Sequence, residues 1–388
     1  MAYNRKQRLN DNIKAIETAF ILDREQRTPT ARERLLLERY CGFGGLKCIL
    51  NPARELADAV HWAKSDLELF APTVELHRLI RENSKNESEY KQLMDSLKQS
   101  VLTAFYTPSA VTEALTDVLK EHQIIPEKVL EPSAGIGAFV DSVLDNNPKA
   151  DIMAFEKDLL TGKILHHLHP EQKVRIEGFE KIEKPFNDYF DLAISNIPFG
   201  DVAVFDPSYT AMKGMRALVT RRIHNYFFVK ALDTVRDGGL VAFITSQGVL
   251  NAKNNSAARF MMLYHADLVS AIRLPNNLFT ENANTEVGSD LIILQKNSQK
   301  ESLRGDDNLL DTVYNDENRI PTNNYFLEHP ERIIHTTAKL DTDSFGKPAM
   351  IYTHEDGVEG IADDLRKMLH EDFKKNLNLN RYLGIEET

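Results

Sequence analysis

Apolar positions near the start of the chain recur with the spacing of amphipathic helices. In the stretch "TARERLLLERYCGFGG", Thr30 is followed three residues later by Glu33, which is the pattern of a helix-capping box. Four residues then supply an apolar face: Leu35, Leu36, Leu37 and Tyr40. Gly42 is placed to end this helix. The polar stretch at 81–92 is predicted to be a loop, with a solvated helix face as the alternative, and residues 1–100 are expected to form a helical region.

Beyond residue 100, short β-rich runs alternate with helical patterns. The expected strands are 128–135, 151–158, 173–179, 189–196 and 239–246, and the expected helices are 109–122, 137–146 and 223–236. Such alternation is typical of a parallel sheet covered by helices on both faces. Two later runs, 266–275 and 288–296, are expected to pair antiparallel around a polar loop. The predicted fold is therefore α/β: a doubly wound, mostly parallel sheet with an antiparallel edge hairpin, next to the helical N-terminal region.

The last part of the chain is less regular. After about residue 300, the stretch "LRGDDNLLDTVYNDENRIPTNNY" is rich in Asp, Asn and turn formers, which predicts a linker. One helix is expected over 360–377. The domain prediction is a helical region at 1–100, an α/β domain at 101–300, and a linker with a C-terminal extension at 301–388.

Composition limits the class of protein. The chain has 388 residues, 42% of them hydrophobic and 27% charged, as in ordinary globular domains. No apolar run approaches the roughly 18 residues that span a bilayer, and the start "MAYNRKQRLN" does not resemble a secretory signal, so we expect a cytoplasmic protein without a membrane partner. Cys41 and Cys48 are expected to be reduced thiols, and neither they nor "HHLH" at 166–169 match a metal site.

Net charge argues against strong autonomous binding to nucleic acid. The formal charge is −11, whereas nucleic-acid binders usually carry a basic footprint. A local basic cluster can still contact phosphates, because net charge governs long-range association rather than single contacts. Residues 211–222, "AMKGMRALVTRR", form such a cluster, in which the cations are Lys213, Arg216, Arg221 and Arg222. They are predicted to contact phosphates, with a solvated surface as the equally weighted alternative.

A glycine-containing turn follows the first expected strand. In "LEPSAGIGAFV", Gly135 and Gly137 allow a sharp turn and close approach of a ligand. Glu156 ends the next strand, where a carboxylate can accept hydrogen bonds from ribose hydroxyls. A dinucleotide fingerprint would need glycine where Val140 stands. The pattern therefore favours a nucleoside cofactor without phosphates, such as S-adenosylmethionine.

The fourth expected strand ends unusually. The stretch "DLAISNIPFGD" (191–201) runs from strand-forming residues directly into Asn-Ile-Pro-Phe-Gly, with an amide, a proline and an aromatic ring that we expect to be exposed. Together with "FYTPSAVTEAL" (105–115) and "LEPSAGIGAF", this turn resembles the γ-ordered methyltransferases that act on N6 of adenine in DNA. The resemblance covers about residues 101–300. "YCGFGGL" and "NNYFLEHPE" further resemble large methylase–helicase polypeptides of phages and mobile elements.

The resemblance implies a fold and a set of cofactor-binding residues. The sheet would be a Rossmann-like methyltransferase sheet with strand order 3-2-1-4-5-7-6 and its site between the first and fourth strands. The residues around the cofactor would be Thr107, Pro108, Glu131, Pro132, Ser133, Ala134, Gly135, Gly137, Glu156, Lys157 and Phe179. The family usually has an Asp-Phe pair where this chain has Gly178-Phe179. The acidic contact with the cofactor's adenine is then either lost or passed to Glu177 or Glu180.

The same resemblance implies the catalytic residues. The side-chain oxygen of Asn196 and the carbonyl oxygen of Ile197 would accept hydrogen bonds from the adenine amino group and free its lone pair. Pro198 would stiffen the turn, and Phe199 would stack on the flipped base, an interaction worth about 1–3 kcal/mol. Cytosine C5 methylation would instead need a nucleophilic cysteine. Both cysteines lie before the cofactor motif, so that chemistry is not expected.

Three functional hypotheses follow. The first is an S-adenosylmethionine-dependent adenine-N6 DNA methyltransferase, with double-stranded DNA as substrate and a helicase or specificity partner. The second uses the same turn to methylate an RNA base or a protein glutamine. The third is a non-catalytic DNA-associated protein with a degenerate methylase fold. Three features suit it: Ile197 stands where the family's motif normally has proline, Gly178 stands where it has Asp, and the net charge is negative.

Overall fold

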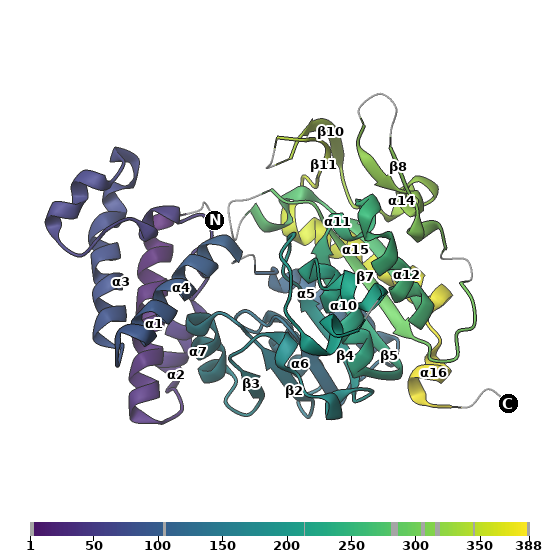
Figure 1. Ribbon diagram of the computed structural model, residues 1–388, viewed down its shortest axis with the longest axis horizontal. Coiled ribbons are helices and arrows are strands. Elements are labelled where there is room, and N and C mark those ends of the chain that lie inside the picture. The colour runs from purple at the N-terminus through teal and green to yellow at the C-terminus, as the bar shows by residue number, and fades with distance from the viewer. Residues whose placement is uncertain are drawn as a thin grey trace.

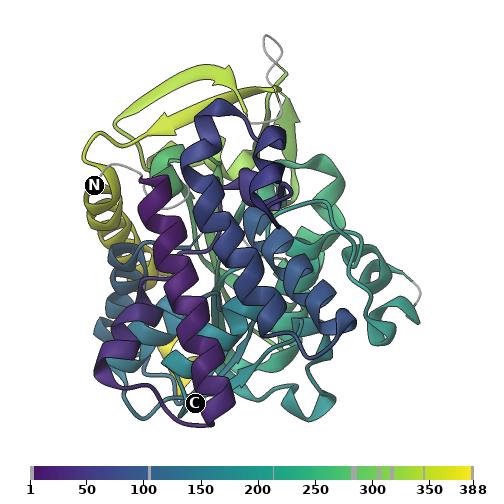
Figure 2. The same cartoon turned by 90° about the vertical axis from the view of Figure 1, so that its left-hand side faces the viewer.

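The computed structural model describes residues 4–103, 106–212, 214–280, 286–303, 307–314, 319–343 and 346–385. Figure 1 shows the N-terminal helices standing beside a larger α/β body, and Figure 2 turns these helices toward the viewer. Three of them contact α7 (Leu159–Leu168), a helix that flanks the sheet. Leu160 and Ile164 of α7 are buried together with the core of the N-terminal helices. The two parts of the molecule are therefore joined by shared apolar contacts.

The N-terminal region is helical, as the sequence predicts. Its elements are α1 (Arg5–Glu25), α2 (Ala31–Glu38), η1 (Lys47–Leu50), η2 (Leu56–His61), η3 (Lys64–Leu69), α3 (Phe70–Glu82) and α4 (Glu87–Thr103). The predicted capping box is present, because Thr30 N donates to Glu33 Oε2 at 2.8 Å and Glu33 N donates to Thr30 Oγ1 at 3.3 Å. The helix ends at Glu38 rather than at Gly42.

Two details of this region differ from the prediction. Of the expected apolar face, Leu37 and Tyr40 are buried, whereas Leu35 is 59% exposed. The cause is the shortness of α2, which turns one narrow side toward α1 and α7. The stretch at 81–92 is mostly helical, so the loop prediction is wrong there. Asn86 Oδ1 accepts a hydrogen bond from Glu89 N at 2.9 Å near the start of α4.

The sheet has seven strands in the order β3-β2-β1-β4-β5-β7-β6, which confirms the expected topology. The strands are β1 (Lys128–Glu131), β2 (Asp151–Phe155), β3 (Lys173–Arg175), β4 (Phe190–Asn196), β5 (Val235–Ser246), β6 (Ala266–Leu274) and β7 (Ser289–Lys296). Strands β1 to β5 pair in parallel, and β7 pairs antiparallel with both β5 and β6. The α/β fold class is therefore confirmed.

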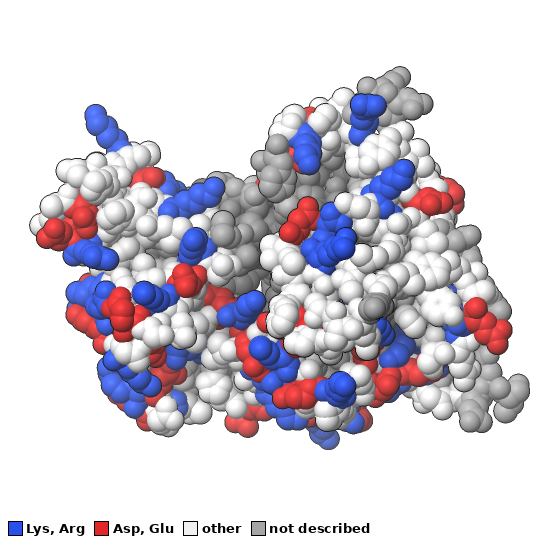
Figure 3. All heavy atoms as spheres, viewed as in Figure 1, with Lys and Arg blue, Asp and Glu red and all other residues white. Residues whose placement is uncertain are grey.

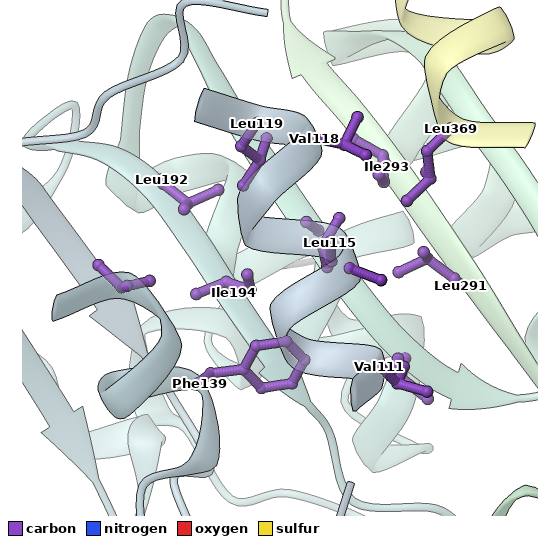
Figure 4. Packing of buried hydrophobic residues seen from close by; sticks show 14 of the residues in the cluster. Val111, Leu115, Val118, Leu119, Phe139, Leu192, Ile194, Leu291, Ile293 and Leu369 are labelled. Carbon is purple, nitrogen blue, oxygen red and sulfur yellow. The ribbon is translucent and has the colours of Figure 1, made fainter. Parts of the chain in front are cut away.

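Helices cover both faces of the sheet because the strand residues alternate between two hydrophobic cores. Leu192 and Ile194 of β4 belong to one core, and Ala193 belongs to the other. The first core is covered by α5 (Ser109–Glu121), α6 (Ala138–Asn146) and α15 (Gly357–Asn376), and the second by α10 (Ile223–Thr234) and α12 (Ser256–His265). Figure 4 shows Leu115 and Val118 of α5 in the first core beside side chains of β7 and α15.

The chain after residue 300 is more ordered than the predicted linker. Its described elements are η8 (Asp307–Leu310), β8 (Thr312–Tyr314), β9 (Pro321–Asn323), α14 (Asn324–Glu328), η9 (Pro330–Arg332), β10 (Thr337–Thr342), β11 (Pro348–Thr353), α15 and α16 (Leu379–Leu383). The expected C-terminal helix is present as α15. It packs on α5 and β6 and buries Leu365, Leu369 and Phe373 in the first core. These residues thus belong to the α/β body.

Candidate active site

The candidate site lies where the strand order of the sheet reverses, between β1 and β4. Strand β1 pairs with β2 on one side and with β4 on the other, so the turns after β1 and β4 leave the same edge of the sheet. In open α/β sheets, ligands bind outside the carboxyl ends of the strands at this switch point. The predicted cofactor turn and the predicted catalytic turn are therefore neighbours in the fold.

The turn after β1 is shaped by two glycines. Gly135 and Gly137 have φ values of +58° and +94°, a backbone region that favours glycine. A Cβ at Gly135 would lie 2.8 Å from the ring of Tyr106, and one at Gly137 would lie 2.6 Å from His169 Nε2. Ala134 N donates to the carbonyl oxygen of Phe155 at 2.8 Å, which ties the turn to β2. Both the conformation and the available space thus exclude larger side chains.

Glu156 holds this turn in place from the end of β2. Its Oε2 accepts a hydrogen bond from Gly135 N, and its Oε1 accepts one from Asp158 N, both at 2.8 Å. Removal from water and the proximity of Asp158 raise the pKa of Glu156 to about 8. The expected ribose-binding carboxylate therefore lies against the backbone of the cofactor turn.

Two buried polar atoms beside the turn have no partner within the described part of the chain. They are Glu131 Oε2 and Thr107 Oγ1. Glu131 is only 2% exposed, and burial raises its pKa well above the ordinary value. Its other oxygen lies 3.5 Å from Ser195 Oγ, which lies 3.2 Å from the carbonyl oxygen of Ser133. Because unsatisfied buried polar groups are costly, these two atoms are typical of a site that a polar ligand completes.

The turn after β4 is fixed mainly by Ile197. Ile197 N donates to the carbonyl oxygen of Ile244 at 3.0 Å, and its side chain is 1% exposed in the second core. Asn196, at the last position of β4, and Pro198 are half-buried. The expectation of an exposed Phe199 is wrong, because this ring is half-buried and meets Phe279 edge-to-face at a centroid distance of 6.4 Å. Asn196 therefore lies at the rigid end of β4.

Two acidic residues flank Gly178 in the segment after β3, Glu177 and Glu180. A Cβ at Gly178 would overlap the carboxylate of Glu180, so that carboxylate fills the space of the missing side chain. Glu180 Oε1 also lies 3.8 Å from Lys157 Nζ, whose side chain is 78% exposed. Glu177 instead binds Arg175 at 2.6 Å. Phe179 is 1% exposed and packs against Phe155 and two aromatic residues of α10, Tyr226 and Phe227.

Two further residues of this site were missed by the sequence prediction. The ring of Tyr106, from the quoted "FYTP" stretch, covers Gly135, and burial raises its pKa. Asp158 accepts hydrogen bonds from Ser96 of α4 and from Thr161, and its burial raises its pKa to about 6. The position of Asp158 two residues after Glu156 was the available signal. These contacts connect the N-terminal helices to the cofactor turn.

The predicted phosphate-contacting cations do not share one environment. Arg216 forms two hydrogen bonds with Asp233, at 2.6 and 2.9 Å, and Arg222 binds Asp201 at 2.6 Å. Arg221 is exposed, and Lys213 lies outside the described residues. The basic stretch contains no acid, but the fold brings acids from other segments to it. Figure 3 shows positive and negative side chains intermixed on the visible face.

Other candidate features are structural in the described chain. The "HHLH" stretch lies at the end of α7, where His167 Nε2 is 2.7 Å from Asp23 Oδ1. Among the residues that the structure describes, no group of three or more His, Cys, Asp or Glu side chains is placed to hold a metal ion. The helices in the same residues include none with the length and apolarity needed to cross a bilayer. Cys41 and Cys48 are free thiols.

The strand order, the glycine turn, Glu131 at the end of β1 and Glu156 after β2 define a Rossmann-like methyltransferase domain. A family model described as N-6 DNA Methylase matches residues 88–387, and the chain belongs to this family. S-adenosylmethionine is the methyl donor that this family uses.

Two relatives match in sequence. Defense against restriction protein B of Escherichia phage P1 is 29% identical over 201 residues, which cover 50% of this chain and 8% of that protein. Type II methyltransferase M.XamI of Xanthomonas campestris pv. amaranthicola is 24% identical over 173 residues, covering 41% of this chain and 33% of that protein. The matched segments thus span a third or less of the relatives' lengths.

Solved structures with a similar arrangement include two bacterial methyltransferases. The methyltransferase subunit of a type I restriction-modification system from Streptococcus thermophilus is 13% identical, with a TM-score of 0.45, covering 99% of this chain and 88% of that chain. A putative class I S-adenosylmethionine-dependent methyltransferase from Listeria monocytogenes is 15% identical, with a TM-score of 0.44, covering 77% of this chain and 91% of that chain.

Proposed function

We propose that this protein transfers a methyl group from S-adenosylmethionine to N6 of an adenine that is flipped out of duplex DNA. The proposal is carried by the Asn-Ile-Pro-Phe turn after β4, because β4 is hydrogen-bonded to the strand that enters the cofactor turn. This juxtaposition suits direct transfer between a cofactor at β1 and an acceptor at β4. Membership in the N-6 DNA methylase family supports the choice of adenine.

The chemistry requires placement of the acceptor nitrogen. The amino group of adenine is a weak nucleophile because its lone pair is delocalised into the ring. Asn196 Oδ1 and the carbonyl oxygen of Ile197 accept hydrogen bonds from its two N–H groups. These hydrogen bonds draw the nitrogen toward tetrahedral geometry. Placement can lower a barrier by roughly 7–11 kcal/mol. As the N–C bond forms, the S–C bond of the cofactor would break, S-adenosylhomocysteine would leave, and N6 would release one proton to solvent, so we assign no general base.

Phe199 serves base placement in this proposal. Its edge contact with Phe279 restricts the ring without covering it fully, since Phe199 is half-buried. A flipped base that stacks on this ring would recover about 1–3 kcal/mol, comparable with the few kcal/mol lost on extrusion.

The cofactor fits the residues around the β1 turn. S-adenosylmethionine supplies a methyl group that its sulfonium centre activates for transfer. Glu156 would accept hydrogen bonds from the ribose hydroxyls. Glu131 Oε2 and Thr107 Oγ1, which lack partners in the described chain, would gain them from the polar groups of the ligand. These three residues would therefore supply polar contacts to S-adenosylmethionine around the β1 turn.

Glu180 is the carboxylate that we assign to the adenine end of the cofactor. It fills the space beside Gly178, whereas Glu177 is already engaged by Arg175. Burial of Phe179 in the second core fixes the backbone between these two acidic residues. Glu180, two residues after Gly178, would thus replace the acidic contact that the Asp of the family's Asp-Phe pair makes.

The substrate class is tested by offering the protein labelled S-adenosylmethionine with duplex DNA, with RNA and with a protein extract. We expect label in DNA. Label only in RNA or protein would overturn the DNA assignment while retaining the enzyme. Failure to bind the cofactor, measured by calorimetry, would instead favour the non-catalytic alternative.

A partner that supplies sequence specificity or helicase activity is part of the same proposal. The matched segment covers only 8% of the phage P1 relative. Mapping modified adenines across a methylation-free genome tests this point. We expect loose specificity from the isolated protein, and one strict motif would contradict it.

A further inference from the structure

The segment between the catalytic turn and α10 forms a closed loop, which we call the outer segment (residues 200–222, described except for Lys213). Val204 N donates to the carbonyl oxygen of Thr220 at 2.8 Å, and Asp201 binds Arg222 at 2.6 Å. These two contacts join the ends of the loop directly after the Asn-Ile-Pro-Phe turn. In Figure 2 the segment lies at the right-hand edge of the molecule, where a thin grey trace interrupts the teal ribbon.

Polar side chains of the outer segment point inward. Asp206 is 3% exposed, and its Oδ2 accepts hydrogen bonds from Tyr226 at 2.7 Å and Lys230 at 3.1 Å. Tyr209 donates its hydroxyl hydrogen to Asp233, which also binds Arg216. These anchors are buried or half-buried and hydrogen-bonded to α10. They therefore fix the conformation of the loop against α10.

Apolar side chains of the same segment point outward. The exposed ones are Val202 (61%), Phe205 (76%), Met212 (50%), Met215 (43%) and Leu218 (41%). Isolated exposed apolar residues are normal on protein surfaces. Five exposed apolar side chains lie on this one loop beside the buried anchor Asp206, and such exposure marks an interaction surface.

We propose that the outer segment contacts the opened DNA around the target adenine, with Phe205 placed against the base stack that the adenine leaves. The proposal rests on the proposed function. Extrusion of a base uncovers the apolar faces of its neighbours, and proteins fill such gaps with Phe, Leu, Ile or Met side chains. The outer segment begins directly after Phe199, and Phe205 lies six residues further along the chain.

Position favours DNA over a protein as the occupant of this surface, because the outer segment begins directly after the Asn-Ile-Pro-Phe turn. Arg221 of this segment is exposed, whereas Arg216 and Arg222 are paired with Asp233 and Asp201. Exposed apolar side chains with one exposed arginine beside a proposed methyl-transfer site suit bases flanked by phosphates.

The test compares Phe205→Ser with Leu56→Ser. The control removes a side chain that is 83% exposed on η2, in the N-terminal region. Both variants receive a duplex that contains a site methylated by the unchanged protein, either fully paired or with a mismatched base opposite the target adenine. Extrusion from the mismatch costs less.

We expect Phe205→Ser to slow methylation of the paired duplex by roughly tenfold or more and to recover most of that loss on the mismatched duplex. Leu56→Ser should match the unchanged protein on both. Equal losses on the two duplexes, or no loss, would overturn the inference but leave the proposed function intact. If the unchanged protein methylates no DNA, both fail. If Phe205→Ser methylates DNA normally but loses a bound partner protein, the inference is overturned and the outer segment is a protein-binding surface.

Discussion

The two sides of the candidate site satisfy their polar groups in opposite ways. On the β1–β2 side, Glu156 caps backbone N–H groups, and Glu131 and Thr107 keep buried polar atoms without partners in the described chain. On the β4 side, Arg216 and Arg222 are already paired with Asp233 and Asp201. There the unsatisfied surface is apolar instead. The first side is therefore prepared for a small polar ligand, and the second for a macromolecule.

The largest effect is expected at the β4 turn. Asn196→Ala removes one of two acceptors for the amino group, and removal of a single stabilising hydrogen bond at a reaction centre typically lowers kcat by about 10²–10³. Cofactor affinity should not change, because Asn196 is not among the proposed cofactor contacts. Steady-state methylation and calorimetry measure these two quantities.

The matched control is Asn187→Ala, which makes the same change in an exposed residue before the other end of β4. It should leave both quantities unaltered. Equal activity of the Asn196 variant and the unchanged protein would reject the role of the amide. A parallel loss of cofactor affinity would show that Asn196 belongs to the cofactor side of the site.

The next effect is expected on the cofactor side. Glu180→Gln should weaken S-adenosylmethionine binding by roughly tenfold or more, since hydrogen bonds to charged groups contribute about 1.5–3 kcal/mol. Glu177→Gln, at the acid that binds Arg175, should change binding little. Calorimetric titration of both variants decides between the two acids. The reverse ranking would show that Glu177 holds the cofactor.

A smaller effect concerns the pH dependence of stability. The folded-state pKa of Glu156, about 8, lies above its ordinary value of 4.5 because of burial. Between these pH values the folded protein keeps a proton that the unfolded chain releases, so the free energy of unfolding falls as pH rises. Glu156→Gln should make this fall shallower between about pH 5 and pH 8.

Neighbouring acids limit that effect. Glu131 and Asp158 have raised pKa values as well, so the slope should decrease without vanishing. Urea unfolding at several pH values in the absence of cofactor measures it. An unchanged slope would mean that Glu156 is ionised in the folded protein throughout this range.

The smallest effects separate two arginines of the outer segment. Arg216→Gln should lower the free energy of unfolding by about 1 kcal/mol, because the lost ion pair with Asp233 is partly exposed. Arg221→Gln should leave stability unchanged and reduce the salt dependence of DNA binding by about one phosphate contact. Thermal unfolding and binding at several salt concentrations check both. Reversed behaviour would place Arg216 on the DNA.

Local patterns predicted most of the framework. The strand runs and the turn "EPSAGIG" were readable because each depends on residues adjacent in sequence, and the family resemblance then supplied the strand order. What could not be read depends on distant partners. Phe199 meets Phe279 edge-to-face, and Arg216 is paired with Asp233. No local sequence pattern connects either partner to the turn. The choice between Glu177 and Glu180 likewise required the position of Arg175.

The most direct test is the chemical identity of the product. Duplex DNA is incubated with the protein and isotopically labelled S-adenosylmethionine, digested to nucleosides and separated. Binding of the adenine amino group by Asn196 predicts label solely in N6-methyladenine. Label on N4 or on a ring carbon of cytosine, or on no nucleoside although the cofactor is bound, would contradict it.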